Sequence, residues 1–345
     1  MTKTIISRLL ITFVLLSTGT LYSQNASQYM DVFSTEFRKI QQDMWDYTSS
    51  VSHGKSARKV DKRRLELIQT SDAAYQKAKS QKGFNNSTRY RDSIVSFFKI
   101  NNLVLKEDYA KLVDMEAIAE DSYDAMEAYL LARERASEKL KAAGEMVQKE
   151  QALFAQENNI NLIQQDDALS KKMEIAGQVY ATYNEIYLIF FKSYKQEMYL
   201  MDAINRKDIN AIEQNRISLI ATANEGIEKL KSVKPHKDDM SMVDATNKLL
   251  QFYIEEAEKE TPKMIDFFMA SENFEKVKKG FDAIPEKKRT QSDVNEYNKA
   301  VNDMNSSVGI YNKSNEYLNK KRSAGIDNWN KTAESFTNKH VPKSK

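Results

Sequence analysis

Residues that interrupt helices are rare in this chain, and their scarcity is the strongest constraint on its fold. Only nine glycines and four prolines occur in 345 residues. A β-rich or α/β fold of this length needs more residues of these kinds at its turns. Apolar residues instead recur at spacings of three and four, as the buried side of a helix requires. The sequence therefore predicts an all-α protein of long antiparallel helices joined by short connections.

The apolar periodicity and the few breaks between its stretches place eight helices. Pro262 falls inside the seventh, where it should kink or divide the helix, because its ring removes a backbone N–H and crowds the preceding turn. The expected ranges are about 27–51, 56–81, 88–117, 120–157, 167–204, 208–233, 241–279 and 291–338.

Residues 1–23 have the organisation of a secretory signal peptide. Lys3 and Arg8 give a basic start, an apolar run follows at 9–16, and small polar residues precede the expected cleavage before Gln24. A membrane-spanning helix takes about 20 apolar residues, so this run is too short for an anchor. We expect an exported chain, located in the periplasm or at the cell surface, with no integral membrane span after cleavage.

The chain matches itself when it is shifted by 152 residues. Residues 46–120 then align with 198–272 without a gap, with 14 identities over these 75 positions. Composition alone would give about five, so we interpret the match as an internal duplication. The duplication predicts two tandem units that each resemble a four-helix bundle: unit 1 at 24–160, unit 2 at 161–340, and a basic tail at 341–345. One continuous helical array with a shared core is the alternative.

A basic cluster at 55–64 is the most distinctive local feature. Lys55, Arg58, Lys59 and Lys62 share one helix face, and with Arg63 they form a candidate anion-binding site. The equivalent stretch of the second repeat, 205–216, has three basic and two acidic residues, so the fold does not itself demand the cluster. A solvated helix face is the simpler interpretation.

Signatures of catalysis and of metal binding are missing from the sequence. There is no cysteine, which excludes thiolate chemistry and disulfides, and no histidine follows a glutamate at the spacing used in di-iron bundles. Nucleotide-binding glycine loops and hydrolase motifs are absent too. The acidic stretch 114–127 suits the start of a helix, where carboxylates stabilise the dipole. We expect no cofactor, no metal and no enzymatic activity.

Net charge argues against a nucleic-acid partner. The formal charge is +3, and removing Lys3 and Arg8 with the leader leaves about +1. A nearly neutral chain has no general field that would attract a polyanion as long as DNA or RNA.

The segment YTSSVSHGKSARKVDKRR at 47–64, soon after a predicted signal peptide, resembles a family of exported bacterial proteins. Members are described only as surface proteins of unknown function and occur in Bacteroidota and spirochaetes. The resemblance implies an envelope location and assigns no catalytic residue. The chain has no β-rich sorting domain at its end, so periplasm and outer surface both stay open.

These features favour a non-enzymatic envelope or surface protein that binds or scaffolds through its helical faces, with an envelope protein or an anionic envelope component as partner. A first alternative is reversible binding of anionic lipid or a polyanionic polymer through 55–64. A second is an uncharacterised enzyme or ligand-binding module with a pocket between the units. The oligomeric state is not predicted.

Overall fold

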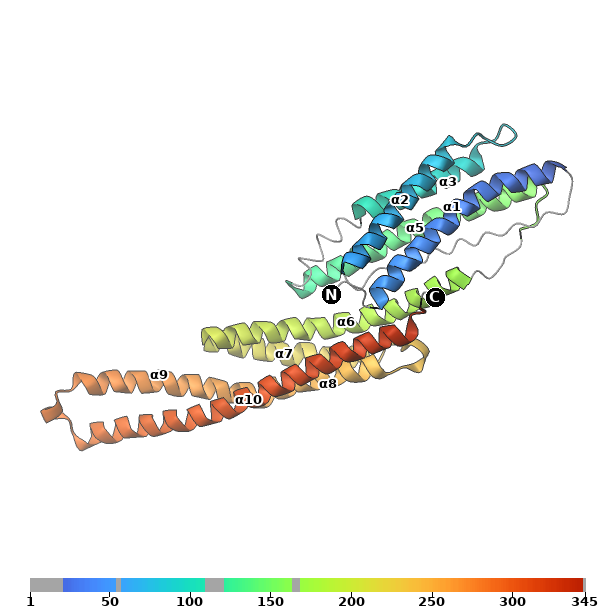
Figure 1. Ribbon diagram of the computed structural model, residues 1–345. Coiled ribbons are helices and arrows are strands. Elements are labelled where there is room, and N and C mark those ends of the chain that lie inside the picture. The colour runs from blue at the N-terminus through green and yellow to red at the C-terminus, as the bar shows by residue number, and fades with distance from the viewer. Residues whose placement is uncertain (1–20, 54–56, 109–120, 163–167, 344–345) are drawn as a thin grey trace. The chain divides into compact units, whose positions relative to one another are not determined.

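The computed structural model describes residues 21–53, 57–108, 121–162 and 168–343, and within these ranges the chain is all-α (Figure 1). No β-strand occurs there, and Phe84 and Ser87 form only an isolated bridge in a turn. The predicted fold class is therefore confirmed. Lys55 and residues 1–20 of the predicted signal peptide lie outside the described ranges.

The helices follow the predicted ranges closely, because each is specified by local periodicity. Pro262 divides the predicted seventh helix, and the third changes from an α- to a π-helix at Val104. The elements are α1 (Leu21–Ser52), α2 (Ala57–Ser80), α3 (Arg89–Leu103), η1 (Val104–Asp108), α5 (Tyr123–Glu157), α6 (Ala168–Arg206), α7 (Ile209–Leu230), η2 (His236–Asp238), α8 (Ser241–Glu255), η3 (Glu256–Glu260), α9 (Thr261–Ala283), η4 (Glu286–Lys288) and α10 (Gln291–His340).

Two compact units share the chain. One comprises Met1–Asn184 with Ser335–Lys345, and the other comprises Glu185–Glu334. Both divisions fall inside helices, since α6 is 39 residues long and α10 is 50, long enough to take part in two cores. The boundary expected at 160–161 assigned each helix wholly to one unit. That expected division into domains stays a prediction.

In the first unit, α1 packs along α2, α2 along α3, and α3 along α5. Aromatic side chains fill the space between them. The ring of Phe37 on α1 lies 5.1 Å from Phe97 and 4.6 Å from Phe98 on α3, measured between centroids. His340 at the end of α10 and Val341 after it are also buried in this unit.

In the second unit, the core lies between α7, α8 and the parts of α6 and α10 that belong to it. Trp329 on α10 is buried, stacks on Phe190 of α6 at 4.1 Å, and donates a 2.9 Å hydrogen bond from its indole N–H to Thr246 of α8. Polar contacts along the edge join α6 to α7, including a 2.7 Å ion pair between Lys192 and Glu225.

Several elements recur at the spacing of the sequence repeat. The bounds of α3 and η1, shifted by 152 residues, coincide with those of α8 and η3. The turns before them match as well: Asn85 and Asn86 have positive φ, and so do Lys237 and Asp238 at the same shift. A duplication at this spacing predicts this pattern of bounds, and the duplication itself remains a prediction.

None of the helices in the described ranges combines the length and the apolar character that crossing a bilayer requires.

Candidate functional site

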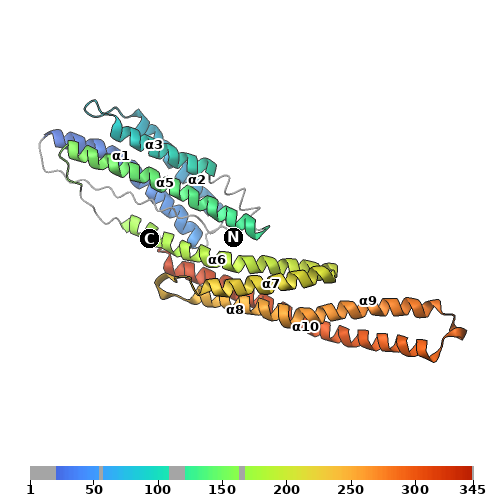
Figure 2. The same cartoon turned by 180° about the vertical axis from the view of Figure 1, so that it is seen from behind.

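A helical hairpin in the second unit separates itself from the core. We call residues 261–313 the arm: α9, the turn around η4, and the first part of α10. Figures 1 and 2 show the two helical segments of the arm running antiparallel and extending beyond α7 and α8. We call each segment a strand of the arm, in the sense used for coiled coils.

A single apolar seam joins the two strands of the arm. Its members alternate at spacings of three and four, the heptad pattern of a coiled coil. They are Phe267, Ala270, Phe274, Val277 and Phe281 on α9 with Ile284 just after it, facing Val294, Tyr297, Val301, Met304, Val308 and Tyr311 on α10.

Ring contacts fix the register of this seam. The centroids of Phe267 and Tyr311 lie 4.4 Å apart, and those of Phe281 and Tyr297 lie 4.6 Å apart and stack. Phe281 lies two heptads after Phe267 on α9, and its partner Tyr297 lies two heptads before Tyr311 on α10. The arm is therefore an antiparallel two-stranded coiled coil with a defined register.

No further layer covers the arm in the described part of the chain. Every seam residue is only half-buried, and Ala300 is the one buried residue between positions 269 and 313. A Cβ atom placed on Gly280 or Gly309 would meet nothing within 4 Å. The outer faces of both strands are thus solvated, and the arm adds little to the core of its unit.

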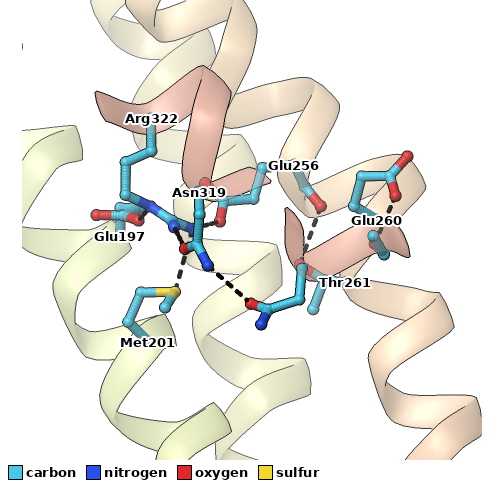
Figure 3. A network of polar contacts seen from close by, with 9 residues as sticks. Glu197, Met201, Glu256, Glu260, Thr261, Asn319 and Arg322 are labelled. Carbon is cyan, nitrogen blue, oxygen red and sulfur yellow. Dashed lines mark hydrogen bonds and ion pairs between the residues drawn. The ribbon is translucent and has the colours of Figure 1, made fainter. Parts of the chain in front are cut away.

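A buried ionic network lies where the arm leaves the core, and Figure 3 shows it. We call Glu197, Glu256 and Arg322 the buried triad. The guanidinium of Arg322 donates from Nε to Glu197 and from Nη2 to Glu256. It also donates from Nη1 to Asn319 at 2.9 Å, and Nη2 lies 3.2 Å from the sulfur of Met201.

Burial makes this network electrostatically unusual. The side chains of Glu197 and Glu256 are 3% and 0% exposed, and that of Arg322 is 14% exposed. Burial, then repulsion from Glu197, raises the pKa of Glu256 to about 7 despite the pairing with Arg322. Burial also raises the pKa of Glu197. Two carboxyls thus share one cation, and the network is suited to holding a proton near neutral pH.

The sequence shift of 152 residues places apolar residues of the first unit at the positions of the two carboxylates of the triad. Trp45 lies 152 residues before Glu197, and Val104 lies 152 residues before Glu256. Both of these apolar side chains are buried. The π-helix is not the source of the triad, because η1 has the same form with an apolar residue at its start. The triad is therefore particular to the unit that has the arm.

The position of the triad indicates a structural role at the root of the arm. It joins α6, η3 and α10, and Ser314 donates a 2.5 Å hydrogen bond to Glu260 one turn further along. The hydroxyl of Thr261 donates a 2.9 Å hydrogen bond to the backbone carbonyl of Glu256. Carboxylates this deeply buried are closed to a substrate, so we assign the triad to fixing how the two strands leave the core.

The far end of the arm is strongly basic. We call residues 276–289 the tip; it has two acids, Asp282 and Glu286, and six basic residues: Lys276, Lys278, Lys279, Lys287, Lys288 and Arg289. The Arg289 guanidinium lies 4.3 Å from the centroid of the Phe281 ring and donates from Nε to the Ile284 carbonyl at 3.1 Å. These contacts close the turn and keep the apex in place.

The predicted anion-binding cluster lies at the start of α2. Arg58, Lys59 and Lys62 are exposed there, and Lys55 lies outside the described ranges. The positive charge of Arg63 is partly neutralised, because its guanidinium lies 2.8 Å from the carboxylate of Glu66 and 3.8 Å from that of Asp46 on α1. Lys62 lies 3.7 Å from the same Glu66. Anion binding by these residues stays a prediction.

Histidines and carboxylates do not form a metal centre in the described ranges, where no group of three or more such residues is placed to hold an ion. His53 contacts Asn338 and the carbonyl of Pro342 in the first unit, at 3.1 and 3.2 Å. His236 is buried in the second unit.

The arm was missed because the periodicity of α9 and α10 resembles that of any amphipathic helix. A stricter criterion is that the spacings between apolar residues alternate strictly between three and four on two consecutive helices. This pattern distinguishes a two-stranded coiled coil from a helix that packs against a core. The triad has no such local signal, because positions 197, 256 and 322 come together only through tertiary packing.

Comparisons with protein-family models, with curated proteins and with solved structures found no match to this chain.

Proposed function

We propose that the chain is a non-enzymatic, exported envelope or surface protein that binds or scaffolds through helical faces, and that the arm is its binding element. The observation that carries the proposal is the solvated coiled coil at 261–313, which extends from its unit without adding a layer to the core.

The energetics of the arm support this role. Ordering a residue costs about 1–2 kcal/mol of backbone entropy, which a core residue offsets by burial. Residues 269–313 have one buried side chain among them and rely on a half-buried seam. The second unit has its own core around Trp329 without them, so the arm is best explained by what its surface contacts.

The envelope location rests on the predicted signal peptide at 1–23 and on the resemblance of segment 47–64. Export also agrees with the lack of cysteine, because thiols in an oxidising compartment are prone to disulfide formation.

Removing the arm tests the proposal. Residues 270–308 are replaced by a four-residue Gly-Ser turn, which keeps the Phe267–Tyr311 layer and the buried Phe268. We expect the thermal midpoint to change by only a few degrees, because the lost segment contains one buried residue. Binding to isolated envelope fractions, measured by co-sedimentation, should fall to background.

The control shortens the arm and preserves its tip. Deleting 269–275 and 303–309 removes one heptad from each strand, about 10 Å of length, and leaves the remaining seam in register. A second comparator, Arg58→Glu with Lys59→Glu and Lys62→Glu, tests the alternative at the start of α2. Full envelope binding by the arm-less variant, with loss in this comparator, would refute the arm and favour segment 55–64.

A further inference from the structure

We propose that the tip of the arm docks on an anionic, phosphate-bearing lipid surface. This inference rests on the proposed function and names the partner of the arm.

The arm is basic at its outer end and acidic near its root, as docking of the tip on an anionic surface requires. The outer half, residues 276–302, has seven basic and four acidic residues. The inner half and root, residues 255–275 with 303–323, have nine acidic and six basic residues. An anionic surface therefore attracts the tip and repels the root, which orients the arm end-on.

Five of the basic residues at the tip are lysines that are exposed and form no ion pair with any residue in the described ranges: Lys276, Lys278, Lys279, Lys287 and Lys288. Lysine is a mobile point charge, suited to the diffuse field of many headgroups, whereas recognition of one phosphate favours the planar fork of arginine. The arginine of the tip, Arg289, is engaged with Phe281 and Ile284.

The apex favours a lipid surface over a soluble polyanion. Ala283 and Pro285 are exposed and Ile284 is half-buried, so a short apolar segment lies between the lysines of α9 and those of η4. Apolar residues flanked by lysines match an interface that has charged headgroups above an apolar layer. A soluble polymer offers the charge without the apolar layer.

Vesicle sedimentation tests the inference with the full mature chain. The probe is phosphatidylcholine vesicles containing 30% phosphatidylglycerol, at low salt. Lys278→Glu, Lys279→Glu, Lys287→Glu and Lys288→Glu are combined in one variant, and we expect its partition coefficient to fall at least 50-fold. Wild-type partition should fall steeply as salt rises and should be negligible on phosphatidylcholine alone.

A matched variant controls for total charge. Arg58→Glu, Lys59→Glu, Lys62→Glu and Lys231→Glu change the net charge equally and should keep partition within threefold of wild type, with helicity by circular dichroism unchanged in both variants. Loss in this control with retention in the tip variant would overturn the proposal, and so would tight binding of polyphosphate with none of the vesicles.

Failure of this inference and failure of the proposed function give different results. If the arm-less variant loses envelope binding while the tip variant keeps vesicle binding, the arm is the binding element and its tip is not the lipid-docking site. If the arm-less variant keeps envelope binding, the proposed function fails whatever the vesicles show.

Discussion

Replacing Arg322 with methionine is expected to lower the free energy of unfolding of the second unit by about 3–5 kcal/mol at pH 8. The change removes the one cation shared by Glu197 and Glu256, whose side chains are 3% and 0% exposed. Two buried carboxylates without that partner must either take up protons or open to water. Urea unfolding followed by circular dichroism measures the loss, which should be smaller at pH 5, where protonation neutralises the carboxyls.

The matched control replaces the whole triad with apolar residues. Because the first unit buries Trp45 and Val104 at the equivalent positions, Glu197→Leu with Glu256→Val and Arg322→Leu should be close to wild type or more stable by about 1–4 kcal/mol. A second control, Arg206→Met, removes an exposed pair with Asp202 and should cost less than about 1 kcal/mol. Equal losses in Arg322→Met and Arg206→Met would show that the triad is not buried as described.

Stability of the second unit should fall as pH rises from about 5 to 7, by up to about 3 kcal/mol. The pKa of Glu256 is raised to about 7 in the folded protein, against 4.5 for an ordinary glutamate. Between these values the folded state binds a proton that the unfolded state has released, so raising the pH favours unfolding. Carboxyls whose pKa is lowered, such as Glu36 and Glu260, act in the opposite sense but at lower pH.

Glu256→Gln isolates this contribution. Glutamine keeps an oxygen that can accept from Arg322 but cannot ionise, so most of the dependence between pH 5 and 7 should disappear, leaving the smaller part due to Glu197. Unfolding free energies measured in urea at pH 5, 6, 7 and 8 give the comparison. A wild-type profile that rises over this window, or one that Glu256→Gln leaves unchanged, would contradict the raised pKa.

Local periodicity was sufficient to predict the helices, because each amphipathic helix repeats its apolar residues within its own length. Even the division of the 241–279 segment followed from Pro262. The proline is not the whole cause, however, since η1 has the same π form and Ala110 stands at the position equivalent to Pro262. The division of α6 and α10 between two cores depends on packing and has no local signal.

The candidate site was predicted less well than the fold. Counting basic residues led to 55–64, where six occur within ten positions, and the structure then placed Arg63 and Lys62 beside Glu66. The tip has as many basic residues spread over 276–289, and a turn between two helices brings them together. Only the antiparallel pairing of α9 with α10, fixed by layers such as Phe281 with Tyr297, shows that these lysines share one end of a solvated arm.

Site-specific photo-crosslinking in living cells tests most directly whether the arm is the binding element. A photoreactive benzophenone residue is introduced in place of the exposed Ala283 at the tip, and at Lys59 on α2 and Lys231 after α7 for comparison. The account predicts crosslinked adducts, to lipid or to protein, from position 283 and little above background from 59 and 231. Abundant adducts from position 59 with none from 283 would contradict it.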